Sequence, residues 1–291
     1  MKVFISCDME GVAGIVDWAQ CRPDGGAAYE RGCRLLLDEV NAAIRGAVGA
    51  GATDVVVNDS HGAMANLDPA AIEAPATYIS GRHKPGYMMQ GLDDSFDAVF
   101  FVGYHGSISG APSVLSHTYN PEVISAVRLA GTDVGESGVN ALVADACRVP
   151  VALVTGDDVT LAEAARVAPD HVGVQVKTSI TRFAAHHLRP EDACARIEQG
   201  AAEAVERADH LPDRIDVDDL SLEVDLQTAD MAAVGAWVKG VEQVGPRTVR
   251  VSGRPAGESG AESRRGERSD GRAVYDAFVA LTYITRQAGG R

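Results

Sequence analysis

VFISCDME, residues 3–10, begins as a short apolar run and ends in two carboxylates, Asp8 and Glu10. The same pattern recurs along the chain, because DVVVN (54–58) runs into Asp59 and His61 and VFFVGY (99–104) runs into His105. Short continuous runs of Val, Ile and Phe predict strands that are buried on both faces, as in a parallel sheet covered by helices. Ligands bind such sheets outside the carboxyl ends of the strands. The sequence therefore predicts one shared site, with metal-binding groups at several strand tips.

The strands alternate with segments of helical spacing, which predicts an α/β fold with a doubly wound, mostly parallel sheet and helices on both faces. After about residue 188 the character changes to an Ala-rich amphipathic helix and strands that alternate apolar with polar residues, as antiparallel strands with one wet face do. We therefore expect a catalytic α/β domain over 1–188 and a smaller α+β domain over 189–291. Within the second domain, residues 253–272 consist mainly of Gly, Ser and charged residues, which predicts a mobile loop. The predicted helices are 29–51, 136–147, 160–168 and the closing stretch AVYDAFVALTYITRQ (273–287), and the predicted strands include 2–7, 77–80, 149–155 and 172–178.

Composition narrows the class of protein. The chain has 291 residues and a formal net charge of −15, which argues against a nucleic-acid partner because such proteins need clustered Lys and Arg. The amino terminus enters a strand at once and lacks the apolar stretch of a signal peptide, and no uncharged run is long enough to span a bilayer. The cysteines are odd in number and contain no Cys-x-x-Cys pair, which predicts reduced thiols in a cytoplasmic protein; they are Cys7, Cys21, Cys33, Cys147 and Cys194.

A metal centre is the best single explanation of the strand-tip residues. Taken alone, each has a simpler reading, such as a solvated acidic pair for Asp8 and Glu10 or a structural histidine for His61 or His105. Together, two carboxylates and two imidazoles at three strand tips suit zinc or another first-row divalent ion. Glu136, which opens a predicted helix, would complete a set of five, and one bridging carboxylate would make a two-metal site.

Two further features leave alternatives open. His117 lies in a Gly/Ser/Pro loop twelve residues after His105; it is either a surface histidine or a general base, acid or nucleophile beside the metal. Asp157 and Asp158 follow a strand and either hold a ligand histidine from behind or cap the next helix. The chain contains no Ser-His-Asp pattern, nucleophile elbow or P-loop.

Several longer blocks resemble one known family. DMEGVAG (8–14), VNDSHG (57–62), SHT (116–118), VGESGVNALVA (134–144) and VKTSITR (176–182) are similar, in this order, to blocks of the DppA-type zinc-dependent D-aminopeptidases. The resemblance runs from residue 1 to about 188 and continues weakly beyond. It implies a two-domain α/β peptidase with two zinc ions per subunit, assembled as a ring-shaped homodecamer. It also implies metal ligands Asp8, Glu10, His61, His105 and Glu136, with Asp8 bridging, and His117 as base or nucleophile.

These features predict a cytoplasmic dizinc aminopeptidase that removes the N-terminal residue, of D configuration, from short peptides. Two alternatives stay open at this point: a metal-dependent amidase or esterase, and a non-catalytic metal-binding assembly protein. The segment 253–272 and the loop 18–28 depart from the family pattern, and the loop leaves the preferred side chain open because loops over a site shape its pocket. The closing helix is apolar around much of its circumference, which gives a modest reason to expect an assembly.

Overall fold

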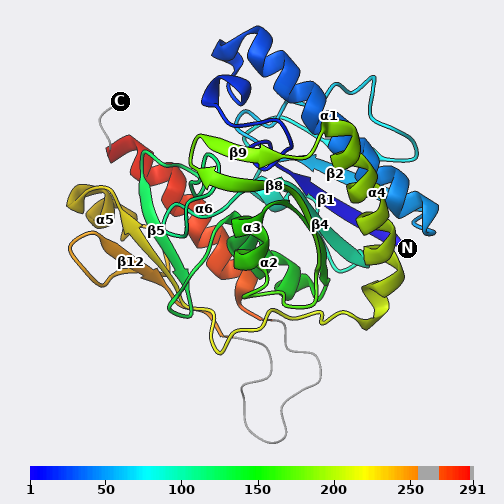
Figure 1. Cartoon of the computed structure of the whole chain (residues 1–291). Helices are drawn as coiled ribbons and strands as arrows, with labels where there is room; N and C mark the ends of the chain where they lie inside the picture. The colour runs from blue at the N-terminus through cyan, green and yellow to red at the C-terminus, as the bar shows by residue number, and fades with distance from the viewer. Residues whose placement is uncertain (255–268, 289–291) are drawn as a thin grey trace, which may run out of the picture.

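The main layer of the computed structural model, which describes residues 1–254 and 269–288, is a seven-stranded sheet that we call sheet A (Figure 1). Its strands lie in the order β3-β2-β1-β4-β7-β8-β9 and are parallel except for β9, which pairs antiparallel with β8. Their bounds are β1 Lys2–Cys7, β2 Asp54–Asp59, β3 Thr77–Ile79, β4 Ala98–Tyr104, β7 Val151–Asp157, β8 Val172–Thr181 and β9 Ala184–His187.

The strand order creates a crevice at the carboxyl end of β1. The chain builds outward from β1 through β2 to β3 and then returns to place β4 on the other side of β1. Connections on either side of such a switch point diverge, which leaves room for a ligand between them. Every residue of β4 and β7 is buried, as their continuous apolar sequence predicts. The tips of β1, β2 and β4 therefore meet at one edge of a rigid sheet.

Helices cover both faces of sheet A, which confirms the predicted fold class. On one face lie α1 (Ala27–Gly49) and α4 (Pro190–Arg207), and on the other α2 (Glu136–Cys147) and α3 (Asp158–Ala164) (Figure 1). The helices α1 and α4 pack closely because Gly46 has no side chain, and a Cβ there would lie 2.1 Å from the carbonyl oxygen of Glu198. Short 3-10 turns complete the connections: η1 Trp18–Gln20, η2 Pro23–Gly25, η3 Tyr87–Met89 and η4 Ala208–His210.

A second sheet, which we call sheet B, lies beside the first and has the order β11-β12-β10-β5-β6. All its pairs are antiparallel, and β10 alternates buried with half-buried residues as its sequence predicts. The last helix, α6, packs against α2, α5 and β12 (Figure 1). The bounds are β5 Ile124–Leu129, β6 Thr132–Asp133, β10 Leu222–Leu226, β11 Val241–Gln243, β12 Thr248–Val251, α5 Ala229–Gly235 and α6 Gly271–Ala288.

The closing helix buries its apolar faces within its own chain. Tyr275, Phe278 and Leu281 of α6 are fully buried in a core shared with α2 and sheet B. The apolar circumference of α6 is therefore explained within one chain and gives no separate reason to expect an assembly, because the helix lies between two layers that cover its apolar residues.

The elements on either side of residue 188 are interleaved in space. The helix α4 follows that position but packs on α1, and β5 precedes it but pairs with β10 of sheet B. The division into 1–188 and 189–291 stays a prediction about folding units, and the two sheets divide the chain differently. Residues 255–268 of the loop predicted over 253–272 lie outside the described part of the chain. The helix predicted over 160–168 begins earlier, at Asp158, because Asp157 caps it, and it ends at Ala164.

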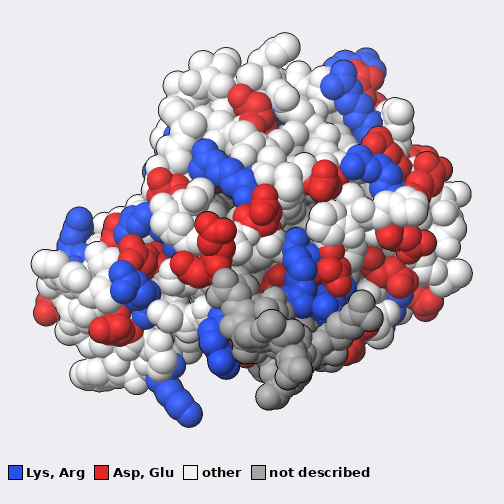
Figure 2. Space-filling view, turned by 90° about the horizontal axis from the view of Figure 1, so that it is seen from below, with Lys and Arg blue, Asp and Glu red and all other residues white. Residues whose placement is uncertain are grey.

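Acidic and basic side chains are interspersed on the face of the molecule seen in Figure 2, and no continuous basic patch covers the described residues of that face. The formal net charge of the chain is −15. Among the helices of residues 1–254 and 269–288, none combines the length and the apolar character that crossing a membrane requires.

Candidate active site

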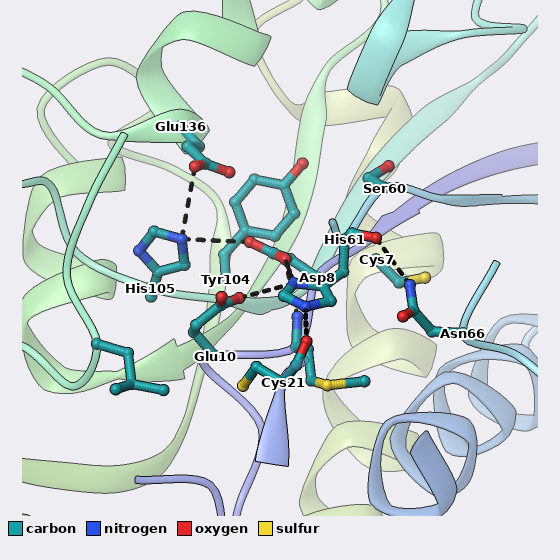
Figure 3. A network of polar contacts seen from close by, with 12 residues as sticks. Cys7, Asp8, Glu10, Cys21, Ser60, His61, Asn66, Tyr104, His105 and Glu136 are labelled. Carbon is teal, nitrogen blue, oxygen red and sulfur yellow. Dashed lines mark hydrogen bonds and ion pairs between the residues drawn. The ribbon is translucent and has the colours of Figure 1, made fainter. Parts of the chain in front are cut away.

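The five predicted metal ligands converge at the carboxyl edge of sheet A (Figure 3). Asp8 and Glu10 follow β1, His61 follows β2 and His105 follows β4, while Glu136 is the first residue of α2. Each of the five side chains is at least nine-tenths buried. The sheet topology alone brings the first four together, because parallel strands end at a common edge.

Asp8 stands at the centre of the cluster. Its Oδ1 lies 3.0 Å from Nδ1 of His61, and its Oδ2 lies 3.3 Å from Nε2 of His105. Glu10 Oε2 approaches the same nitrogen of His61 at 3.0 Å, and Glu136 Oε1 lies 3.6 Å from His105 Nε2. The residues thus form two groups of three that share the Asp8 carboxylate (Figure 3).

Backbone carbonyls orient both imidazoles. Nε2 of His61 lies 2.7 Å from the carbonyl oxygen of Cys21, and Nδ1 of His105 lies 2.9 Å from that of Gly106. A carbonyl only accepts, so these nitrogens donate. In a neutral imidazole the other nitrogen then carries the lone pair, which is Nδ1 in His61 and Nε2 in His105. Both lone pairs point at the carboxylates, an orientation typical of metal-binding histidines.

The pKa values reflect the crowding of opposite charges. Burial opposes ionisation of Asp8, yet its contacts with His105 and His61 hold the pKa of this carboxyl well below its usual value. Burial also opposes charge on the two imidazoles, but the neighbouring carboxylates raise the pKa of both His61 and His105 well above the usual value. Burial raises the pKa of Glu136 despite the nearby charge of His105. Positive charge is therefore strongly favoured at the centre of this cluster.

The donor set fits a divalent cation. Glu10 Oε2 and His105 Nε2 are buried and make no hydrogen bond with any described residue. The three carboxylates of the cluster have no Lys or Arg within ion-pair distance in the described part of the chain. Buried charges without partners are costly, and carboxylate oxygens with imidazole nitrogens are the ligands that zinc accepts.

His117 lies beside the cluster. Its ring stacks on that of His105, with centroids 4.2 Å apart, and the edge of Trp18 packs on it at 5.4 Å. Its Nδ1 donates to the carbonyl oxygen of Leu115 at 3.0 Å, so Nε2 keeps the lone pair and lies 3.7 Å from Glu136 Oε1. Burial, with a smaller contribution from His105, lowers the pKa of His117 to about 4. The interpretation of His117 as an isolated surface histidine was wrong.

A cavity of about 490 Å³ opens over the cluster. The loop predicted to cover the site does so, because Trp18, Cys21 and Arg22 line the cavity. The opposite wall comes from the far end of the chain, where one side of α6 contributes Val279, Thr282, Tyr283 and Arg286. Tyr87 stacks on Tyr119 between these walls, with ring centroids 5.0 Å apart.

Two acidic residues at strand tips shape loops and lie outside the group of candidate ligands. Asp59 accepts hydrogen bonds from the backbone N–H groups of Asn66 and Leu67 and so holds the turn that follows His61. Asp157 caps α3 by accepting from the backbone N–H of Thr160 at 2.8 Å. Of the two roles considered for Asp157 and Asp158, holding a ligand histidine or capping the next helix, the structure supports the helix cap.

Sequence reasoning missed several residues of the site. Cys21, treated as a packing residue, has its thiol within 4.8 Å of the ligand atoms of Glu10 and His61. Tyr119 donates its backbone N–H to Glu136 Oε1 at 2.7 Å. Lys177 reaches the site from β8 in the middle of an otherwise alternating strand. A lysine is almost never fully buried unless its charge is paired, but the burial of Lys177 was not visible in the sequence. Within the described residues, none of the five cysteines forms a disulfide.

Comparison with known proteins gives one consistent result. A model of the M55 peptidase family, described as D-aminopeptidase, matches residues 1–258. A D-aminopeptidase of Bacillus subtilis (strain 168) is 38% identical over 222 residues, which cover 74% of this chain and 79% of that protein. The structure of the zinc-dependent D-aminopeptidase DppA from Bacillus subtilis, described as a self-compartmentalizing protease, superposes with a TM-score of 0.86. It is 31% identical in sequence, and the match covers 99% of this chain and 98% of that one.

Proposed function

The chain belongs to the M55 peptidase family of D-aminopeptidases, which are hydrolases of peptide bonds, and we propose that it removes an N-terminal D-amino acid from short peptides with the help of zinc. The observation that carries the proposal is the buried Asp8 carboxylate between two ligand groups at the floor of the cavity. This set of residues suits a hydrolytic metal centre with an additional imidazole, His117, at its edge.

We assign two zinc ions to the two ligand groups. Asp8, Glu10 and His61 would hold one ion, and Asp8, His105 and Glu136 would hold the other. Glu10 Oε2 and His105 Nε2, which are buried without a hydrogen bond to any described residue, support this assignment. When bound, zinc would polarise the scissile carbonyl and lower the pKa of a water molecule, which is the chemistry that peptide hydrolysis needs.

His117 would move the proton. Its Nε2 carries a lone pair at the cavity side of the cluster, and its Nδ1 is fixed by Leu115. It would accept a proton from the attacking water at Nε2 and return it to the nitrogen of the leaving amine as the C–N bond breaks. Stacking on His105 and the edge of Trp18 hold the ring in place for both transfers.

The rest of the cavity suits a short peptide. Three tyrosines, Tyr87, Tyr119 and Tyr283, supply flat apolar walls, and Tyr283 meets Tyr87 edge-on at 5.8 Å. Arg286 lies one turn beyond Tyr283 on α6 and makes no ion pair with a described residue. A guanidinium there is available for the carboxylate of a bound peptide.

Paired substrates test the activity and its stereochemistry. Zinc-loaded protein should hydrolyse D-Ala-D-Ala and leave L-Ala-L-Ala largely intact, with release of free alanine as the measurement. Hydrolysis of the L isomer alone would refute the preference for D residues, but the proposal that the protein is a peptidase would stand. Hydrolysis only of a simple amide or ester, or zinc binding with no hydrolysis at all, would favour the other two classes that the ligand set permits.

We further propose a cytoplasmic homodecamer that encloses its active sites. Support comes from the structurally similar DppA, described as self-compartmentalizing, and from large apolar side chains on the surface of this chain. Ile180, Phe183 and Trp237 are 64%, 56% and 75% exposed, and contacts between subunits would cover such side chains. Light scattering coupled to size exclusion tests the proposal, and an active monomer or dimer at micromolar concentration would refute it.

A further inference from the structure

A buried lysine without a carboxylate partner lies directly behind one of the candidate ligands. Lys177, in β8, is 2% exposed. Its Nζ donates to the carbonyl oxygens of Glu10, Val12 and Ile15 at 2.6, 3.0 and 2.9 Å. An ammonium has three N–H donors and no acceptor, so the three carbonyls use its full donor capacity.

The three carbonyls belong to the turn that carries Glu10 out of β1. On its other side this turn is pressed against β4, because the N–H of Gly11 donates to the carbonyl oxygen of Gly103 at 2.8 Å. A Cβ at position 11 would lie 1.8 Å from the carbonyl oxygen of Tyr104, so only glycine fits. The turn that carries Glu10 is therefore held by Lys177 through its carbonyl oxygens and by β4 through the N–H of Gly11.

Burial of the Lys177 ammonium is unfavourable for stability, which suggests that the charge serves the site. Removing an ammonium from water costs several kcal/mol, and burial lowers the pKa of Lys177 to about 8. Among the described residues, no carboxylate lies within ion-pair distance of its Nζ. A leucine or methionine would fill the same space without this cost but would remove the donor to the three carbonyl oxygens, so the role of the charge is tied to this turn.

We propose that Lys177 is a positioning residue of the metal centre, which fixes the turn that presents Glu10 and so sets the affinity of the ion held by Glu10 and His61. The inference rests on the ligand assignment of the proposed function. Lys84 makes a similar contact behind β2, where its Nζ donates to Asn58 Oδ1 and to the carbonyl oxygen of Asp59, both at 2.5 Å. Two of the ligand-bearing strand tips are thus held by buried ammonium groups.

The test is the zinc affinity of the full-length Lys177→Met variant, measured by competition with a chromophoric chelator. Loss of a group that orients a ligand costs about 10–100-fold in metal affinity. We expect a loss of that size for one of the two zinc equivalents and a smaller change for the equivalent held by His105 and Glu136. Lys177→Gln retains two N–H donors without the charge and should fall between the wild type and Lys177→Met.

Val176→Ala is the matched control. Val176 is the neighbouring residue of β8 and is fully buried, so its truncation destabilises the same strand and removes no hydrogen bond to the turn. It should lower the melting temperature and leave both zinc affinities unchanged. Amide hydrogen exchange of residues 11–16 in zinc-free protein gives a second reading, and Lys177→Met should accelerate it at least about tenfold while Val176→Ala does not.

The outcomes separate the two proposals. Wild-type protein that binds no zinc would overturn the proposed function and, with it, the role of Lys177. Normal zinc binding by Lys177→Met, with unchanged exchange in residues 11–16, would overturn the role of Lys177 alone. If Lys177→Met does not fold, the comparison of Lys177→Gln with Val176→Ala decides, since equal zinc affinities in these two variants would refute the inference.

Discussion

Glu39 should make the free energy of unfolding depend on pH between about 5 and 8. This residue of α1 is 2% exposed, and its Oε1 accepts the backbone N–H of Ala13 at 2.8 Å while its Oε2 is buried without a hydrogen bond among the described residues. Burial raises the pKa of Glu39 from 4.5 to about 7, although the Ala13 N–H and the charge of Lys177 oppose the rise.

The direction of the pH dependence follows from whether the folded or the unfolded protein binds the proton of Glu39 more tightly. The folded protein retains the proton of Glu39 up to about pH 7, whereas the unfolded chain loses it near pH 4.5. Stability contributed by the protonated form is therefore complete below pH 4.5 and is lost as the pH rises through 7. At 1.36 kcal/mol per pH unit the full loss is about 3 kcal/mol, of which about 2 to 3 kcal/mol falls between pH 5 and pH 8.

The Glu39→Gln variant isolates this contribution. Glutamine is neutral throughout and can accept the same hydrogen bond, so its stability relative to the wild type should rise by about 2 to 3 kcal/mol from pH 5 to pH 8. Urea unfolding of zinc-free protein at several pH values measures the difference, and groups that titrate in both proteins cancel. A difference that stays constant over this range would show that folded Glu39 ionises normally and would refute the reasoning.

Other predictions concern the site. His117→Ala should lower kcat about 10²–10⁴-fold, or about 3 to 5 kcal/mol, with near-normal zinc content by elemental analysis; a near-wild-type kcat would remove His117 from the mechanism. Asp8→Ala should lose more of the expected two zinc equivalents than any other single ligand variant, because Asp8 faces both imidazoles. Arg286→Gln should raise KM for a dipeptide more than for its C-terminal amide, and equal effects would exclude a carboxylate contact. Asp157→Ala removes five hydrogen bonds, four of them buried, and should cost about 3 to 5 kcal/mol in urea unfolding.

The sheet and its site were predictable because both depend on local patterns. Uninterrupted apolar runs such as VFFVGY identify buried parallel strands, and parallel strands place whatever follows them at one edge. Asp8, His61 and His105 could therefore be grouped before any coordinate was known. Glu136 does not follow a strand, and it could be added only as a fifth candidate at the start of a predicted helix, because its position is fixed by a long connection through sheet B.

The rest depends on contacts between segments far apart in the chain. Nothing near Lys177 indicates that its ammonium reaches the carbonyl oxygen of Glu10, 167 residues away. The apolar character of α6 indicated that the helix is buried but could not tell a neighbouring layer from a second subunit. Tyr119 is positioned by a loop whose course is set by packing, and loops carry little periodicity to interpret.

The floor of the cavity and one of its walls come from different parts of the chain. Its floor is made by strand tips within the portion that the family model matches, and one wall is made by α6, which begins at Gly271, after that match ends at residue 258. A substitution in the floor disturbs the chemistry itself, whereas Tyr283 and Arg286 face the cavity from a helix that donates no candidate ligand. Substitutions at these α6 positions can therefore change which peptides the cavity accepts and leave the candidate metal ligands unchanged.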